Sequence, residues 1–375
     1  MKDDLKICVY AICKNEEKHI DRWINSLKDE ADKIVVLDTG SSDDSVSLLK
    51  KYEPLVSVYQ KEINPWRFDV ARNESLKLIP DDIDICLVSD LDQIIRPGWA
   101  KAIKDLFREG YTEIEGDIID YDDNNKEISR FLSKNVHPNN PNWYWTRPIH
   151  EGLEYHGKNP DDVKIAFSPH FIIEHHPDRT KSRGNYLNLL ELEYEENSLD
   201  PLCAIYYGCE LEFNGRYDES FQVFLKAQEE CDYTGKEDIY YRNSLNIALG
   251  YIERGDFENA LKYTDEAYKT GYITRELYNV YIIIYDSMND KEKLIEYINK
   301  SITCPTDYRG WIENSVLLAG GNFSSVSHYF EDYENDLSRA LVYKFIEKIS
   351  LPDKDYVQND FENLYNKYRE VKNNE

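Results

Sequence analysis

Four apolar runs in the first ninety residues most constrain how this chain can fold. They are KICVYAIC at 6–13, KIVVLDTG at 33–40, VSVYQ at 56–60 and IDICLVSD at 83–90. Predicted helices lie between them at 15–30, 41–52 and 68–79. Near-continuous apolar strands that alternate with helices are typical of βαβ units, in which a parallel sheet is covered on both faces. We therefore predict an N-terminal α/β domain with a doubly wound sheet, extended by strands at 111–125 and 163–176 that flank an aromatic loop at 142–157.

A helical pattern with glycine at the bends replaces this alternation from about residue 185. Six positions recur at an offset of 40: Gly208, Leu211, Gly215, Tyr217, Phe224 and Ala227 match Ala248, Tyr251, Gly255, Phe257, Thr264 and Ala267. A weaker third copy runs from Ile282 to Ile298. Small, aromatic and glycine positions at such intervals are typical of tetratricopeptide repeats. We predict three domains: an α/β domain at 1–184, an all-α repeat domain at 185–303 and a helical cap at 304–375.

The composition narrows the classes of partner. A formal charge of −27 repels polyanions, so we expect no binding to nucleic acid. The N-terminus lacks an apolar signal segment and no window is long and apolar enough to span a bilayer, so we expect no membrane span. Seven scattered cysteines without a C-x-x-C pair favour reduced thiols and a cytoplasmic protein. A homodimer is compatible with the sequence, which does not determine the oligomeric state.

Polar clusters follow three of the predicted strands. They are Lys14-Asn15-Glu16, Asp38-Thr39-Gly40 and Asp90-Leu91-Asp92. The carboxyl ends of parallel strands meet at one edge of a sheet, where ligands bind in such folds. Two carboxylates at D-x-D spacing repel each other unless a cation intervenes, and Mg²⁺ or Mn²⁺ prefers such oxygens together with phosphate oxygens. The alternative is an acidic turn with solvated side chains.

Two other residues at this edge have a chemical and a structural interpretation each. Asp38 can accept hydrogen bonds from a base or a ribose, or it can simply close the turn that precedes a helix. Arg72, beside Asn73 in FDVARN, can bridge a phosphate and a carboxylate, or it can be a solvated charge on a helix.

Three segments taken together resemble a known family. They are ICKNEEKHIDRWINSLKDEADKIVVLDTGSSDDS, PWRFDVARNESL and LVSDLDQII, and they are similar to family 2 glycosyltransferases, which have the GT-A fold of nucleotide-diphospho-sugar transferases. The resemblance is greatest to the bacterial branch with C-terminal tetratricopeptide repeats, which includes the bacteriocin peptide S-glycosyltransferases. It covers roughly residues 5–100, resumes at RPIHEGL and IIEHHPDRTKSRGNYLNLLELEYEENSLDP, and continues through the repeats.

The resemblance implies a role for each matching residue. Lys14, Asn15 and Glu16 would lie against the nucleotide base, and Asp38 would contact uracil or ribose. Arg72 and Asn73 would line the cleft, and Asp90 and Asp92 would bind the metal. His150-Glu151 would match the family's His-Glu pair, and His175 would match a later histidine near the phosphates. The sequence departs from the pattern twice. Gln93 follows the D-x-D where the branch usually has glutamate, and His176-Pro177 stands where an aromatic residue and glycine are usual.

Elementary chemistry suggests how these residues would act. A metal neutralises the departing diphosphate, and His175 would be a third ligand beside Asp90 and Asp92. An inverting transferase needs a base for the acceptor's proton, and our candidate is Glu151. The alternatives are that His175 only packs against its neighbours and that the aromatic loop at 142–157 only packs on the sheet.

These expectations combine into a functional prediction. We predict a metal-dependent inverting glycosyltransferase that uses Mn²⁺ or Mg²⁺ and transfers a sugar from a UDP-sugar, UDP-glucose or UDP-GlcNAc being favoured, to a peptide or protein acceptor. The alternatives are transfer to a surface polysaccharide or a lipid-linked glycan, and a non-catalytic repeat scaffold, which Gln93 keeps open.

Overall fold

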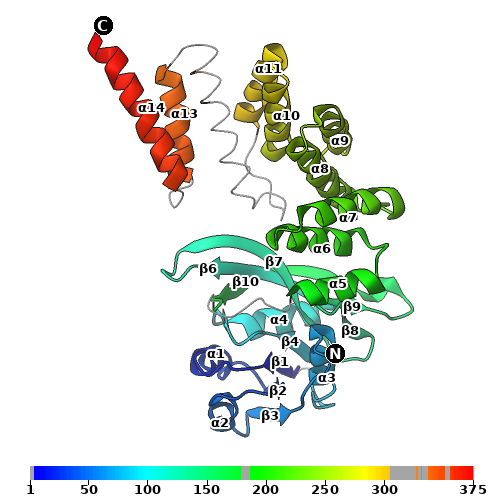
Figure 1. The fold of residues 1–375 in the computed structure, drawn as a ribbon. Coiled ribbons are helices and arrows are strands. Elements are labelled where there is room, and N and C mark those ends of the chain that lie inside the picture. The colour runs from blue at the N-terminus through cyan, green and yellow to red at the C-terminus, as the bar shows by residue number, and fades with distance from the viewer. Residues whose placement is uncertain are drawn as a thin grey trace. The chain divides into compact units, whose positions relative to one another are not determined.

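The computed structural model describes residues 4–178, 186–304, 337–350 and 355–374, together with Ser327 and Glu331 (Figure 1). The chain divides into two compact units, Met1–Glu195 and Glu196–Glu375. The predicted boundary at 184/185 falls in 179–185, outside the described residues, and the predicted domain limits stay predictions. All seven cysteines are free. In the described part of the chain, no helix combines the length and the apolar character needed to cross a membrane.

The first unit is built on an eight-stranded sheet of order β3-β2-β1-β4-β7-β6-β10-β5. Its parallel half consists of β1 (Ile7–Cys13), β2 (Lys33–Asp38), β3 (Val56–Gln60) and β4 (Ile85–Val88). These are the four apolar runs of the sequence, and the predicted parallel βαβ arrangement is confirmed for them. Their order brings the carboxyl ends of β1, β2 and β4 to neighbouring positions at one edge.

The other half of the sheet is mixed, which the sequence did not predict. It contains β5 (Gln93–Ile95), β6 (Glu113–Tyr121), β7 (Glu127–Pro138) and β10 (Ile165–His175). A tight turn between β6 and β7 makes them an antiparallel hairpin, with Asn125 in the left-handed region at φ 58°. β7 then pairs antiparallel with β4. The predicted aromatic loop is a separate two-stranded sheet of β8 (Trp143–Thr146) and β9 (Gly152–Tyr155).

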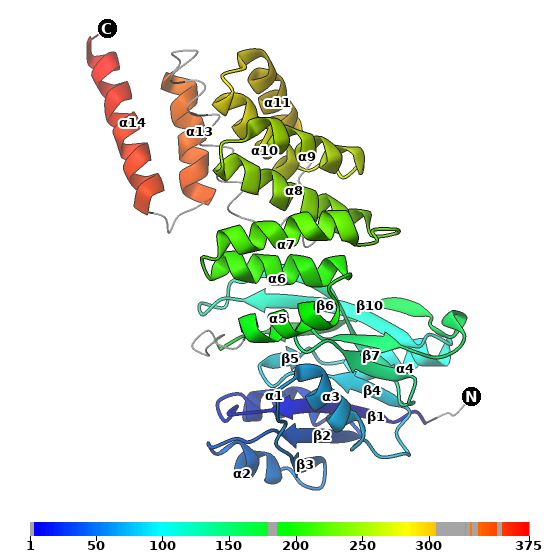
Figure 2. The same cartoon turned by 45° about the vertical axis from the view of Figure 1, so that its right-hand side comes forward.

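Helices cover both faces of the sheet, as predicted for a doubly wound fold (Figure 2). They are α1 (Ile20–Leu27), α2 (Ser45–Lys50), α3 (Phe68–Leu76) and α4 (Trp99–Arg108), and α5 (Tyr186–Glu196) follows later in the chain. Alternate residues of β1 enter two different cores. Val9 packs with α1, α2 and α4, whereas Tyr10 packs with Leu76 of α3 and Trp145 of β8. Because both faces of β1 are buried, its sequence is apolar throughout.

The second unit consists of helical hairpins. They are α6 (Pro201–Phe213) with α7 (Tyr217–Glu230), α8 (Glu237–Glu253) with α9 (Phe257–Lys269), and α10 (Arg275–Ser287) with α11 (Lys291–Thr303). The bends fall at Gly215 and Gly255, with φ of +75° and +71°, and at Asn289 in the third hairpin, with φ of 57°. Left-handed backbone explains why glycine recurs at this position of the repeat.

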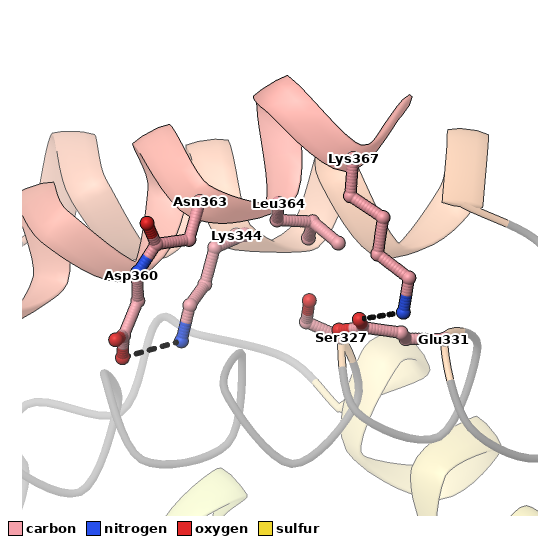
Figure 3. A pocket seen from close by; sticks show the side chains of 7 residues that line it. All are labelled: Ser327, Glu331, Lys344, Asp360, Asn363, Leu364 and Lys367. Carbon is pink, nitrogen blue, oxygen red and sulfur yellow. Dashed lines mark hydrogen bonds and ion pairs between the residues drawn. The ribbon is translucent and has the colours of Figure 1, made fainter. Parts of the chain in front are cut away.

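The predicted C-terminal cap is described only in part. α13 (Leu337–Ser350) and α14 (Asp355–Asn374) are helical as expected, and 305–326, 328–330, 332–336 and 351–354 lie outside the described residues. A cavity of about 400 Å³ lies beside these helices (Figure 3). Ion pairs join Lys344 to Asp360 at 3.5 Å and Lys367 to Glu331 at 2.6 Å across its lining.

Gly208 provides a test of packing in the repeats. A Cβ atom on Gly208 would lie 2.3 Å from the ring of Phe224, whereas the next hairpin has Ala248 and Thr264 at the equivalent positions. We expect Gly208→Ala to lower the free energy of unfolding by about 1–3 kcal/mol, the usual cost of overpacking. In a Phe224→Thr background, which copies the second hairpin, the same Gly208→Ala change should cost less, because the ring that the new Cβ would meet is gone. Urea unfolding of the full chain measures both, and an unchanged midpoint for Gly208→Ala would contradict the packing argument.

Candidate active site at the strand ends

The loops after β1 and β2 are fastened to each other. Asn15 adopts a left-handed φ of 57°, its Oδ1 accepts from the Ser42 amide at 2.8 Å, and its own amide donates to Ser41 Oγ at 2.9 Å. The Glu16 amide donates to Ser45 Oγ at 2.8 Å. Lys14 and Asn15 are exposed at this edge. Two of the three predicted base-binding residues, Lys14 and Asn15, therefore lie on a preformed surface, and the role of this segment in binding stays a prediction.

Asp38 closes the turn after β2. The residue is 1% exposed, and its carboxylate accepts from the amides of Gly40 and Ser41, each at 3.2 Å. Gly40 has a φ of +111°, which a residue with a side chain rarely adopts. The structural interpretation of Asp38 accounts for these contacts, and its contact with a nucleotide stays a prediction.

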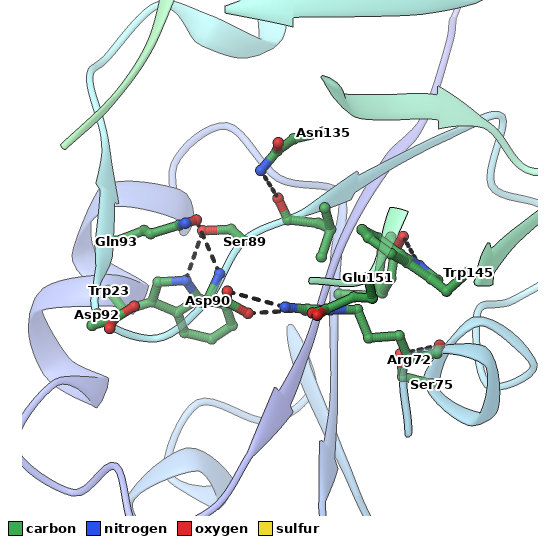
Figure 4. A network of polar contacts seen from close by, with 12 residues as sticks. Trp23, Arg72, Ser75, Ser89, Asp90, Asp92, Gln93, Asn135, Trp145 and Glu151 are labelled. Carbon is green, nitrogen blue, oxygen red and sulfur yellow. Dashed lines mark hydrogen bonds and ion pairs between the residues drawn. The ribbon is translucent and has the colours of Figure 1, made fainter. Parts of the chain in front are cut away.

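Arg72 on α3 joins two carboxylates from distant parts of the chain (Figure 4). Its Nη1 and Nη2 donate to the two oxygens of Asp90 at 2.9 and 3.1 Å, and its Nε donates to Glu151 Oε1 at 2.6 Å. The guanidinium lies 5.0 Å from the ring centroid of Trp145. Burial lowers the pKa of Arg72, but the charges of Asp90 and Glu151 raise it by more, so the group stays charged. The structure thus brings together three of the predicted site residues.

A buried hydrogen-bonded chain holds Trp145 beneath Arg72. The Asn73 amide donates to the Trp145 carbonyl at 2.8 Å and accepts from its N–H at 2.9 Å. The Trp145 Nε1–H donates to Tyr10 Oη at 3.0 Å, which lies 3.0 Å from His137 Nε2. Because His137 Nδ1 faces the Pro138 carbonyl at 2.9 Å, Nδ1 carries the proton and Nε2 accepts from Tyr10. Asn73, predicted to line the cleft, therefore also fixes β8.

Asp92 and His175 meet on the other side of the D-x-D turn. His175 Nε2 lies 3.3 Å from Asp92 Oδ2, and its Nδ1 lies 2.7 Å from Asp120 Oδ1. Burial lowers the pKa of His175, but its hydrogen bonds to Asp120 and Asp92 raise it by more, so that the pKa is about 10. Asp120 was missed by sequence reasoning, because only the register between β10 and β6 places it opposite His175.

Gln93, where the resembled branch has glutamate, supports the D-x-D turn. The residue is 8% exposed and its Oε1 accepts from the Asp90 amide at 3.0 Å (Figure 4). Ser89, just before the turn, accepts from Trp23 Nε1 at 3.1 Å. His150 has a left-handed φ of 49°, immediately before Glu151 enters the site. The backbone around the D-x-D turn is thus held by specific contacts.

The residues at the predicted metal site fit a divalent cation in part. Among the described residues, no group of three or more His, Cys, Asp or Glu side chains is arranged as a metal site. Asp90 is held by Arg72, whereas Asp92 and His175 contact each other. A carboxylate and an imidazole whose other nitrogen is held by a second carboxylate are the surroundings expected of a metal ligand pair. Mg²⁺ and Mn²⁺ sites of this kind take their remaining ligands from water and substrate phosphates.

Comparisons with known proteins identify the first unit. Residues 8–171 match the family described as Glycosyl transferase family 2. The chain carries a family 2 glycosyltransferase domain. An uncharacterized glycosyltransferase of Rickettsia conorii is 31% identical over 98 residues, which cover 22% of this chain and 35% of that protein. The aligned part thus spans about a third of the length of this curated relative.

The chain also matches solved structures, with TM-scores below 0.5. Staphylococcus aureus TarS (residues 1–349) in complex with UDP-GlcNAc has 15% sequence identity and a TM-score of 0.38, and the match covers 78% of this chain and 90% of that one. A thermophilic TPR protein of Thermus thermophilus has 14% identity and a TM-score of 0.36, covering 48% and 88% of the two chains. The predicted similarity to bacteriocin peptide S-glycosyltransferases stays a prediction.

The buried His137, which is hydrogen-bonded through Tyr10 to Trp145, makes the stability of the fold depend on pH. Burial lowers the pKa of His137 from 6.5 to about 4. The unfolded chain therefore binds more protons than the folded one between these values, so stability is full above pH 6.5 and is lost as the pH falls toward 4. We expect this group to remove up to about 3 kcal/mol of unfolding free energy between pH 7 and pH 4.

His137→Gln provides the comparison, because a Gln oxygen can accept from Tyr10 in place of Nε2 but does not titrate. Urea unfolding at several pH values should show a shallower acid loss in this variant than in the wild type. Parallel pH dependences would contradict the assignment of a neutral, buried His137.

Proposed function

We propose that this chain is a metal-dependent, inverting glycosyltransferase that uses a UDP-sugar as donor. The observation that carries the proposal is the pairing of Arg72 with Asp90 and Glu151, beside the Asp92–His175 pair, within a family 2 glycosyltransferase domain. Charged groups gathered at the carboxyl ends of parallel strands are suited to bind a phosphorylated ligand.

Asp92 and His175 would hold Mn²⁺ or Mg²⁺, with Asp90 as a further ligand if it leaves Arg72. The bound ion would supply charge neutralisation for the diphosphate leaving group. Arg72 holds the Asp90 carboxylate through both oxygens and so fixes the first acid of the D-x-D. Lys14, Asn15, Glu16 and Asp38, at the ends of β1 and β2, would receive the uridine, and UDP-glucose and UDP-GlcNAc are the donors we favour.

Glu151 is the proposed base. The acceptor's heteroatom would attack the anomeric carbon, its proton would pass to Glu151, and the bond to the diphosphate would break with its electron pair leaving on UDP. A single displacement of this kind inverts the anomeric configuration. Arg72 fixes Glu151 through Oε1 at 2.6 Å, and the side chain is 14% exposed, so the carboxylate is oriented and still reached by solvent.

We further propose that the acceptor is a peptide or protein that docks on the helical repeats. Stacked helical hairpins such as α6–α11 present extended surfaces of the kind used to bind polypeptides. A surface polysaccharide or lipid-linked glycan is the alternative acceptor. Product labelled from a radioactive donor separates them: a polypeptide product is degraded by protease, and a lipid-linked one is extracted into organic solvent.

A non-catalytic scaffold is the alternative from another class of function. The substitution that raised it, Gln93, accepts a hydrogen bond from the Asp90 amide and so keeps the turn in place. An amide at this position is compatible with an intact site, which favours the enzyme.

Asp92→Asn tests the metal-dependent activity. The wild type should slowly hydrolyse its UDP-sugar to UDP in the presence of Mn²⁺, and EDTA should stop it. Asp92→Asn should abolish this turnover while the chain still folds, because it removes a ligand with little change in side-chain volume. The exposed Asp161→Asn of the same unit is the matched control. Full activity of Asp92→Asn, or of the wild type in EDTA, would refute the metal role.

Glu151→Gln tests the base. Glutamine retains an oxygen that can accept from Arg72 Nε, so the site should keep its shape. We expect the transfer rate at saturating donor to fall by about 10²–10⁴-fold, the usual range for loss of a general base, with little change in donor affinity. Loss of donor affinity at an unchanged saturating rate would assign Glu151 to binding.

A further inference from the structure

A row of polar residues crosses four strands of the mixed half of the sheet. In the strand register Gln93 of β5 lies opposite His175 of β10, His175 opposite Asp120 of β6, and Asp120 opposite Ser129 of β7. The Ser129 hydroxyl donates to Asp120 Oδ2 at 2.6 Å, and the other Asp120 oxygen lies 2.7 Å from His175 Nδ1. The row thus leads from a hydroxyl in β7 to the imidazole beside Asp92.

The two sides of His175 are held unequally. The 2.7 Å contact with Asp120 is short, whereas Nε2 and Asp92 Oδ2 are 3.3 Å apart. A carboxylate at this distance from Nδ1 requires that Nδ1 carry a proton. Nε2 is then the nitrogen on the Asp92 side, and it is the one that would give up its proton to bind an ion, while the shorter contact with Asp120 sets the ring plane.

An irregularity in β10 creates this register. Ile165 pairs with Glu113, 52 positions away, but Ile172 pairs with Asp117, 55 positions away, so β10 has three extra residues relative to β6. Continued without this bulge, the first register would place Ile172 opposite Asp120. The bulge needs Gly116, because a Cβ there would lie 2.3 Å from the Phe171 carbonyl oxygen. Bulges that re-aim a side chain are frequent beside active sites.

We propose that Asp120, supported by Ser129, is a positioning residue that fixes the tautomer and orientation of His175 for the metal. This inference rests on the proposed function, and Asp120 itself does not bind the ion. Asp120 thereby holds the Nδ1 side of the ring while Asp92 contacts the other side, so the site is aligned before a nucleotide sugar binds.

The test compares Asp120→Asn with the wild type as full chains. Asparagine can donate toward Nδ1 and so disturbs the tautomer with little change in volume. Titration calorimetry of Mn²⁺ in the presence of UDP should show about 10–100-fold weaker binding, the usual effect of losing such a support. Saturating Mn²⁺ should largely restore donor hydrolysis. Ser129→Ala should weaken Mn²⁺ binding by a smaller factor. Asp117→Asn changes an acid of the same strand whose side chain lies on the other face of the sheet, and it should leave Mn²⁺ binding unchanged.

Three results would overturn the inference. If Asp120→Asn binds Mn²⁺ as tightly as the wild type, and donor hydrolysis by the wild type depends on the metal, Asp120 has no positioning role and the proposed function still stands. A reduced rate that saturating Mn²⁺ does not restore would assign Asp120 to chemistry or folding instead. A wild type that binds no Mn²⁺ with UDP present and hydrolyses donor equally in EDTA would refute the metal-dependent function itself, and this inference with it.

Discussion

The site depends on one buried cation. Arg72 is 7% exposed and holds Asp90 after β4 and Glu151 before β9, so three segments far apart in the sequence meet at its guanidinium. Removing either carboxylate would leave buried positive charge less compensated, and removing Arg72 would leave two carboxylates facing each other. The planar group with its fixed donors suits this task better than lysine, and the Trp145 ring gives it a surface to lie on.

The sequence predicts the parallel half of the fold well, for a physical reason. A strand buried on both faces, such as β1, has to be apolar throughout, so its sequence is distinctive. Once four such strands alternate with helices, their carboxyl ends share an edge, and Asp38, Arg72 and the Asp90–Asp92 pair follow as site candidates. The repeats are predicted for a similar reason, since left-handed bends favour glycine at fixed intervals, as at Gly215 and Gly255.

The mixed half of the sheet and the contacts of Asp120 could not be predicted, because they depend on pairing between segments that are distant in the sequence. β7 is exposed over most of its length, and polar and apolar residues do not alternate regularly along it, so its sequence did not predict a strand. Asp120 is one acid among several in GDIIDYDD, and only its register with His175 distinguishes it. The sequence shows an aromatic loop at 142–157, but its pairing as β8 and β9 and the use of Asn73 to fix it follow from tertiary structure.

The three-residue bulge in β10 also determines which side chains of that strand enter the core. Side chains alternate between faces, so an odd shift reverses the pattern relative to β6. Ile165 and Phe167 before the bulge are 45% and 47% exposed, whereas Phe171 at its end and Ile173 after it are fully buried. Deleting one residue from 168–170, with the first register kept, would move each later residue one place back, so that Glu174 would take the buried place of Ile173 and His176 that of His175. This segment therefore cannot vary in length as an ordinary surface loop can, and insertions and deletions in it should be as harmful as substitutions in the site itself.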